Sequence, residues 1–335
     1  MRNTLLAAAM ALICGIAAAL PARAETGEVV LARQFGIGYL PLAVMHNQQL
    51  VERHLAEAGL ADTKVTWSRF ATGSAANDAM LSGQLHFAAG GTGPAFILWD
   101  RTRSNWRVHG VAALSSMPNL LVSTDPRLQS LSDFTDTDRI AMAGAGSSVQ
   151  TIYLQMAVSA KWGIENFEKL NSLMVNLPHP EGLNAMLSGS GGIKSTFTTP
   201  PFQQQSLKNE GVHVVLNSYD IMGGENTFLM LWATDRFRTE NPKTFGAVLA
   251  ALREATDWIN ANPRKAAELY VADAAGAEDV DQVEAIITDP QTTFTLAPRR
   301  VLPYAQFMND IGRLKNRPEA WTDLFFPELH DLDGS

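Results

Sequence analysis

The sequence predicts an α/β protein made of two similar lobes, each with a mostly parallel sheet, and three observations predict this fold class. Short apolar strands alternate with glycine-rich loops and helices along most of the chain, which is the pattern of parallel sheets. The chain has 335 residues, enough for two domains. The block at residues 79–96 (AMLSGQLHFAAGGTGPAF) also aligns without a gap with residues 185–202 (AMLSGSGGIKSTFTTPPF), and this repetition favours two similar lobes.

Each copy of the block predicts the end of a helix, a short strand and the start of a second helix. Gly83 and Gly189 suit the left-handed position that follows a helix. In the first copy residues 85–87 alternate as in a strand, and residues 90–94 then predict a flexible turn with Thr92 as the capping hydroxyl. A helix that begins here would point its free amides at a ligand.

Other stretches predict the remaining elements and the two points where the chain passes between the lobes. Strands are expected at residues 29–34, 64–70, 107–114, 119–123, 138–142, 173–177, 212–216 and 227–233, and helices at residues 43–58 and from about 149, 242 and 304 onward. We expect the chain to cross between the lobes at residues 115–118 and to return at residues 218–226. The first lobe would then comprise residues 25–116 and 226–335, and the second residues 117–225.

Residues 1–24 are expected to be an export signal that is cleaved after Ala24. The segment has a positive start, an apolar stretch at residues 5–20, and a small-x-small cleavage site (ARA) at residues 22–24. The apolar stretch is short for a membrane anchor. The only cysteine, Cys14, lies inside this segment, so the mature chain would have no thiol for catalysis or for a disulfide.

Charge and motifs argue against several classes of function. The formal net charge is −8, or −10 once residues 1–24 are removed, and no basic run offers a surface for nucleic acid. No later segment is apolar enough for stable membrane insertion. The loop at residues 144–149 has Val149 where the dinucleotide fingerprint needs glycine or alanine. We expect no catalytic residue, no cofactor and no metal; His179 with Glu181 is only a weak metal candidate.

Polar loops rich in glycine and hydroxyl groups follow expected strands in both lobes, at residues 36–39, 73–75, 90–93, 146–148 and 196–199. Hydroxyl groups and helix N-terminal amides can hold an oxyanion without a full counter-charge. Any single loop could be an ordinary helix cap or turn. Because ligands of α/β sheets bind at the carboxyl ends of the strands, the whole set favours a binding site.

Taken together, these pieces resemble the periplasmic substrate-binding proteins of the nitrate/sulfonate/taurine class of ABC importers, with their related pyrimidine-precursor binders. The resemblance covers about residues 29–272 and is carried by GIGYLP at 36–41, the glycine block at 82–94, residues 130–157, residues 186–202 and ENPKTF at 240–245. It implies the type II periplasmic-binding-protein fold, in which two α/β lobes are joined by two crossovers and close on one ligand.

The resemblance also implies ligand-binding positions. Contacts would fall at Gly38, Tyr39, Gly73, Ser74 and Thr92 in the first lobe and at Ser147, Ser148 and Thr198 in the second. On this basis we expect a sulfonate-like head at Ser74 and Thr92, with its tail against Tyr39 and Phe197. Glu225 in the return crossing is a candidate for contact with an ammonium group on a taurine-like ligand, and the alternative is an exposed loop glutamate. The chain departs from the family at residues 143–145 (AGA), where many members carry a proline before this loop.

The function implied is that of a periplasmic, monomeric binding protein that captures a small organic anion and delivers it to the permease and ATPase subunits of an ABC importer. Nitrate, alkanesulfonate, taurine, sulfate ester, aromatic carboxylate and pyrimidine remain open as ligands. Two alternatives share the fold: an enzyme related to pyrimidine-precursor synthesis, for which Lys194 is the nearest candidate for a reactive amine, and a ligand-sensing module. The export signal favours a binding protein over a cytosolic enzyme.

Overall fold

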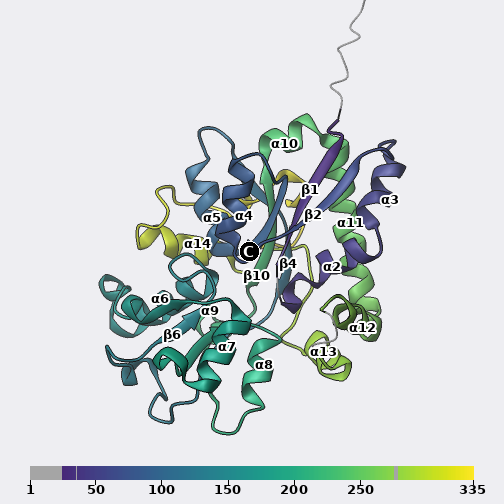
Figure 1. Cartoon of the computed structure of the whole chain (residues 1–335). Helices are drawn as coiled ribbons and strands as arrows, with labels where there is room; N and C mark the ends of the chain where they lie inside the picture. The colour runs from purple at the N-terminus through teal and green to yellow at the C-terminus, as the bar shows by residue number, and fades with distance from the viewer. Residues whose placement is uncertain (1–24, 35, 275–277) are drawn as a thin grey trace, which may run out of the picture.

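The computed structural model describes residues 25–34, 36–274 and 278–335, which form two α/β lobes, the first above the second in Figure 1. The predicted export signal at 1–24 lies outside the described residues. The first sheet contains β1 (Glu28–Arg33), β2 (Lys64–Arg69), β3 (Phe87–Gly91), β4 (Val108–Ser116) and β10 (Thr227–Thr234). The second contains β5 (Leu120–Ser123), β6 (Ile140–Met142), β7 (Met174–Asn176), β8 (Ser195–Thr198) and β9 (His213–Asn217).

The two sheets have the same topology. The strand order is β2-β1-β3-β10-β4 in the first and β7-β6-β8-β5-β9 in the second. In each sheet four strands run in the same direction, and the fourth strand in order runs antiparallel to both of its neighbours. That antiparallel strand, β5 or β10, is the first strand after the chain has passed from the other lobe. Both lobes therefore have one architecture, as the repeated block predicts.

Helices cover both faces of the sheets. In the first lobe they are α2 (Leu40–Asn47), α3 (Leu50–Glu57), α4 (Gly73–Leu81), α5 (Thr92–Arg101), α10 (Asp235–Glu240), α11 (Pro242–Ala261), α12 (Pro263–Asp273), α13 (Val280–Ile287) and α14 (Val301–Asp310). In the second they are α6 (Val149–Trp162), α7 (His179–Ser188), α8 (Phe202–Leu207) and α9 (Ser218–Met222). Short 3-10 turns lie at Ile37–Tyr39, Leu131–Asp133, Ile164–Asn166, Asn171–Leu173, Ser190–Gly192, Trp321–Leu324 and Pro327–Leu329.

The repeated block forms the predicted helix, strand and helix in both copies, as α4-β3-α5 and α7-β8-α8. Gly83 and Gly189 have the expected positive φ angles of 77° and 68°. The predicted turn at residues 90–94 is wrong, because Gly90 and Gly91 belong to β3 and Thr92 is the first residue of α5. These glycines allow close packing: a Cβ on Gly90 would lie 3.0 Å from the Trp232 ring.

The single helix predicted at residues 43–58 is also wrong. The chain forms α2 and α3, separated at Gln48 and Gln49, and Gln49 has the left-handed φ of 51°. The two helices bury different amounts of surface, which explains the break: α2 is buried from Leu40 to Met45, whereas α3 buries only Leu50, Val51 and Leu55. One straight helix could not present both surfaces to the core.

The segments between the lobes are shorter than expected. Because β4 continues to Ser116 and α9 occupies residues 218–222, the backbone that joins the sheets is confined to residues 117–119, the first crossing, and 223–226, the return crossing. The C-terminal helices pack mainly on the first lobe, α11 on α2 and α3, and α14 on α5. Figure 1 shows α14 and α13 on opposite sides of the junction between the lobes. Within the described residues no helix has the length and apolar character needed to cross a bilayer.

Candidate ligand-binding site

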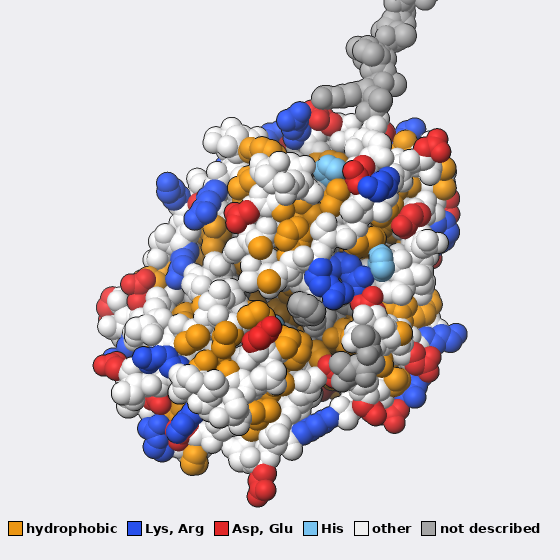
Figure 2. Space-filling model, viewed as in Figure 1, with side chains coloured by type: hydrophobic (Ala, Val, Ile, Leu, Met, Phe, Trp, Pro, Cys, Tyr) orange, Lys and Arg blue, Asp and Glu red, His pale blue; other side chains and the backbone are white. Residues whose placement is uncertain are grey.

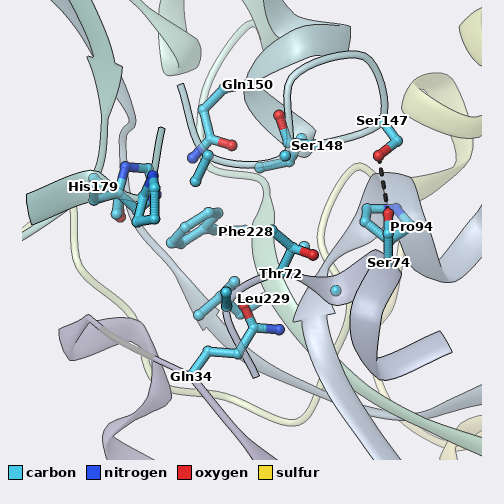
Figure 3. Close-up of a pocket in the computed structure, with 18 of the residues that line it drawn as sticks. Gln34, Thr72, Ser74, Pro94, Ser147, Ser148, Gln150, His179, Phe228 and Leu229 are labelled. Atoms are coloured by element: carbon cyan, nitrogen blue, oxygen red, sulfur yellow. Dashed lines mark hydrogen bonds between the residues drawn. The ribbon is translucent and has the colours of Figure 1, made fainter. Parts of the chain in front are cut away.

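A small cavity lies between the two lobes, at the carboxyl ends of the parallel strands (Figure 3). Its volume is about 60 Å³. The lining comes from both lobes, and most of it comes from the first turns of four helices: Thr72, Gly73 and Ser74 at α4, Gly91 and Pro94 at α5, Ser147, Ser148, Val149 and Gln150 at α6, and Pro178, His179 and Pro180 at α7.

Helix N-termini give this cavity a partly positive wall. The first amides of a helix have no partner within the helix and carry a partial positive charge. The side chain of Thr72 caps α4 by accepting from the amide of Ala75 at 3.2 Å, and that of Ser148 caps α6 by accepting from the amide of Thr151 at 3.3 Å. The caps fix the helix ends in place, because each satisfies an amide that would otherwise be free. Amides from both lobes therefore meet around one cavity.

Hydroxyl groups of the two lobes meet directly at this cavity. The Oγ atoms of Ser74 on α4 and Ser147 before α6 are 3.0 Å apart (Figure 3). One hydroxyl donates to the other, which leaves a second proton free to donate to a ligand. The hydroxyl of Thr199 is buried and has no partner among the described residues, and this residue also lines the cavity. Because a buried unpaired hydroxyl is costly, Thr199 offers a further donor for a ligand.

An imidazole and two amides complete the polar lining. His179 lines the cavity, and its Nδ1 lies 3.4 Å from the Thr198 hydroxyl. Burial lowers the pKa of His179 to about 4, so the ring is neutral at physiological pH. When Nδ1 accepts the proton of Thr198, the Nε2–H remains to donate. Gln150 donates from Nε2 to the Oδ1 of Asn119 at 2.8 Å, and Gln34 to the carbonyl of Ala89 at 2.5 Å.

The remaining walls are apolar and the described lining carries no charged side chain. Phe228 and Leu229 come from β10, Val149 from α6 and Tyr39 from the turn after β1. Burial raises the pKa of the Tyr39 phenol well above its usual range, so this group is also neutral. Lysine, arginine, aspartate and glutamate do not occur among the described lining residues.

A larger cavity of about 460 Å³ adjoins the small one, and Gln34, Tyr39 and Pro180 line both. Arg33 and Asp273 lie in its wall and form an ion pair with each other, and Arg33 Nη1 is 3.0 Å from His46 Nδ1. Figure 2 shows basic side chains beside the hollow between the lobes. Charged groups therefore lie outside the small cavity, not within it.

Five of the ten residues expected from the sequence line the small cavity: Tyr39, Gly73, Ser74, Ser147 and Ser148. The other five do not line it. Gly38 is buried against Leu229, and Thr92 and Phe197 are buried inside their lobes. Thr198 is buried with its hydroxyl next to His179 Nδ1, and Glu225 lies in the return crossing.

Several lining residues were not named as ligand contacts from the sequence. Thr199 belongs to the polar loop predicted at residues 196–199, and Thr72 adjoins Gly73, where the capping pattern could have identified its hydroxyl. Gln150 follows the helix start that the sequence predicts at about residue 149, but its direction depends on how the helix packs, and the start of α7 at His179 was not predicted. No sequence pattern marked Phe228 and Leu229 as lining residues, because they lie in β10, far along the chain from the loops that form the rest of the cavity.

Lys194 and the candidate metal ligands were the residues that an enzyme or a metal site would need. The Lys194 side chain is about half exposed, and its Nζ is 3.3 Å from Asp125 Oδ2, away from the cavity. No group of three or more histidine, cysteine, aspartate or glutamate residues is placed to hold a metal within the described part of the chain.

Comparisons with known proteins agree with this architecture. A family model described as the NMT1-like family matches residues 22–274, well over half of the chain. A search of curated proteins finds no match.

Solved structures share the fold at low sequence identity. The alkanesulfonate-binding protein SsuA from Xanthomonas axonopodis pv. citri, bound to MOPS, has a TM-score of 0.69 and 14% identity, covering 88% of this chain and 96% of that chain. The periplasmic aliphatic sulphonate binding protein SsuA from Escherichia coli has a TM-score of 0.66 and 14% identity, covering 93% and 95%. The periplasmic nitrate-binding protein NrtA from Synechocystis PCC 6803 has a TM-score of 0.66 and 12% identity, covering 90% and 84%.

Identities this low show the fold alone, and they confirm the predicted type II periplasmic-binding-protein fold. The family match rests on the sequence itself. It covers the first lobe through β4, the whole second lobe, and the part of the chain from β10 to the end of α12 that returns to the first lobe. The chain therefore has the periplasmic-binding-protein fold and belongs to the NMT1-like family.

Proposed function

We propose that the protein is the solute-binding component of an ABC importer, which captures a small organic anion between its lobes in the periplasm and delivers it to a membrane permease. One observation carries the proposal: two helix N-termini from each lobe, α4 and α5 from the first and α6 and α7 from the second, border a single small cavity. Helix N-termini stabilise anions without a basic side chain.

The volume of the cavity supports a small head group. A water molecule needs roughly 10–15 Å³ of such space, so 60 Å³ holds on the order of five atoms of that size. A nitrate or sulfonate group fits this limit. A longer tail would leave along Tyr39, which also borders the larger cavity. The binding of sulfonates and nitrate by proteins of the same fold supports the same ligand class.

We assign the head group to Ser74 and Ser147, with Thr199, Gln150 and His179 as further donors. Hydroxyl and amide donors are suited to the oxygens of an anion, and each hydrogen bond to a charged group contributes about 1.5–3 kcal/mol. Tyr39, Gly73 and Ser148 stay in the proposed site because they line the cavity. We propose no ligand contact for Gly38, Thr92, Phe197, Thr198 or Glu225.

Isothermal titration calorimetry with methanesulfonate, taurine, nitrate and a neutral aminopyrimidine tests the proposal. We expect one-site binding of at least one anion, without turnover. The Ser74→Ala and Ser147→Ala variants should each weaken that binding about tenfold or more, since each removes a donor. Ser82→Ala is the matched control, because Ser82 is an exposed serine beyond the other end of α4. Binding of the aminopyrimidine alone, or equal affinities for all three variants, would contradict the assignment.

A further inference from the structure

Helix α6 is hydrogen-bonded to both segments that join the lobes. Gln150 donates from Nε2 to Oδ1 of Asn119, in the first crossing, at 2.8 Å. One helical turn further on, the Tyr153 phenol donates to Oδ1 of Asn226, in the return crossing. All four side chains are buried, with relative exposures of 0–3%. Residues three apart lie on the same side of a helix, so α6 contacts both crossings with one face.

The two asparagines belong to different lobes. Asn119 is fastened to the second lobe, because its amide donates to Ser218 Oγ at 2.8 Å and its carbonyl accepts from the Ser218 amide at 3.0 Å. Asn226 directly precedes β10 of the first lobe, and its Nδ2 donates to the Gly224 carbonyl at 3.1 Å. The Tyr153 bond therefore joins a helix of the second lobe to the start of a first-lobe strand.

The same helix also borders the ligand cavity. Ser148, Val149 and Gln150 form the first turn of α6 and line the cavity, and Gln150 reaches Asn119 from there. Tyr153 lies one helical turn further along α6. The centroid of its ring is 5.7 Å from that of Tyr304 in α14 and 6.4 Å from that of Phe197 in β8. A shift of α6 towards a ligand would therefore act on both crossings.

The return crossing has backbone suited to such a change. Gly223 and Gly224, shortly before Asn226, have φ angles of 73° and 131°, values that residues other than glycine rarely adopt. Hinge closure concentrates backbone changes in a few residues at the ends of elements. Asn226, which accepts from Tyr153, lies two residues after Gly224.

We propose that Tyr153 and Asn226 are positioning residues that set the angle between the lobes through α6, and so couple contact with a ligand to the geometry of the crossings. The effect on ligand binding rests on the proposed function. The effect on the angle between the lobes does not rest on it, because that angle is measured in the protein without ligand.

The test measures the distance between the lobes. Ser82 and Ser188 are exposed, equivalent positions of the repeated block, one in each lobe. In the full chain carrying Cys14→Ser, the pair Ser82→Cys and Ser188→Cys takes two spin labels, because no other cysteine is present. Pulsed electron spin resonance without ligand then gives the distribution of distances between the lobes.

We expect Tyr153→Phe, which keeps the ring, and Asn226→Ala each to broaden that distribution or to move its maximum. The double variant should match the single ones, because both remove the same bond. Thr196→Val is the control: it removes a buried hydroxyl that donates to the Ala141 carbonyl at 3.1 Å within the second lobe, and it should leave the distribution unchanged. An anion that binds the parent protein should dissociate about three- to tenfold faster from Tyr153→Phe.

Distributions for Tyr153→Phe and Asn226→Ala that coincide with the parent's would overturn the inference, whatever happens to ligand binding. Changed distributions in a protein that binds no anion would support the positioning role and count against the proposed function instead. An equal change in Thr196→Val would also overturn the inference, because it would show that any lost hydrogen bond has the same effect.

Discussion

At the scale of single residues, the distinctive feature of the site is that polar groups converge on a cavity whose described lining has no charge. Ser74, Ser147 and Thr199 offer hydroxyls, and His179 is neutral because burial lowers its pKa to about 4. An anion in this cavity would be held by partial charges and oriented donors. Such a site depends on precise placement of each donor, since no strong long-range attraction compensates for a donor that points away.

The buried histidine also makes stability depend on pH. The folded-state pKa of His179, about 4, is below the value of about 6.5 in the unfolded chain, so the unfolded state takes up the proton first as the pH falls. The contribution of His179 to the free energy of unfolding is therefore complete above about pH 6.5 and is lost between about pH 6.5 and 4, by up to about 3 kcal/mol.

Urea unfolding at pH 7 and pH 5 measures this effect. Burial also lowers the pKa values of His46, His86 and His109, so the comparison is between the parent and His179→Gln. The loss of stability between the two pH values should be smaller in the variant by roughly 2 kcal/mol. An equal loss in both proteins would show that His179 has no such effect.

Polar loops singled out from the sequence contribute residues to the cavity, but the direction of each side chain could not be predicted. Thr198 was expected to contact ligand, yet it faces His179, and the neighbouring Thr199 lines the cavity. Successive residues of an extended chain point to opposite sides, so a shift of one position changes which side chain lines the cavity. A serine directly at a helix start, such as Ser74, leaves less freedom, because the capped end of α4 fixes its position.

At the scale of elements, the close approach of α5 and α6 brings the two lobes together at the cavity. Gly91 at the end of β3 lies against Val149, where a Cβ would be 3.2 Å from the Val149 Cβ. Gly93 in the first turn of α5 lies against the loop before α6: a Cβ there would be 2.7 Å from the carbonyl oxygen of Ser147. Glycines permit this contact because any side chain would push the helices apart.

Gly93→Ala therefore tests the contact between the lobes. The added methyl group cannot fit without a shift of the Ser147 backbone, so Ser147 should lose its place opposite Ser74 and anion affinity should fall about tenfold or more. Calorimetric titration measures the change. Gly246→Ala is the control, because Gly246 lies in α11 with nothing within 4 Å of the added methyl. Unchanged affinity in Gly93→Ala would show that this contact does not set the site.

Helices and strands with strong local sequence patterns could be predicted. Those whose ends depend on packing against residues far along the sequence could not. The repeated block predicted α4-β3-α5 and α7-β8-α8 because its glycines and alternating apolar residues are local signals. The break at Gln49 between α2 and α3 carries no glycine or proline and follows from how the two helices pack. The glycines of β3 were mistaken for a turn, because the sequence does not show what approaches them.

At the scale of the whole molecule, two sheets of equal topology are joined by two short crossings and bordered by one C-terminal region. All five strands of the second sheet come from one continuous stretch, residues 120–217, whereas the first sheet takes β10 from beyond that stretch, so the first lobe is built from two separated segments of the chain. Arg313, which follows α14, donates to the Gly146 carbonyl at 2.6 Å and so reaches the loop that holds Ser147. The division into lobes at residues 117 and 226 stays a prediction.

A thermal-melt comparison of the purified protein with and without each ligand class tests the central claim most directly, that the cavity between the lobes binds a small anion. A ligand at about a hundred times its dissociation constant adds roughly 2.7 kcal/mol to the free energy of unfolding. We predict that a sulfonate or nitrate ligand raises the melting temperature by several degrees, and that the rise is lost in the Ser74→Ala, Ser147→Ala double variant. A rise with a neutral aminopyrimidine and none with any anion would contradict the account.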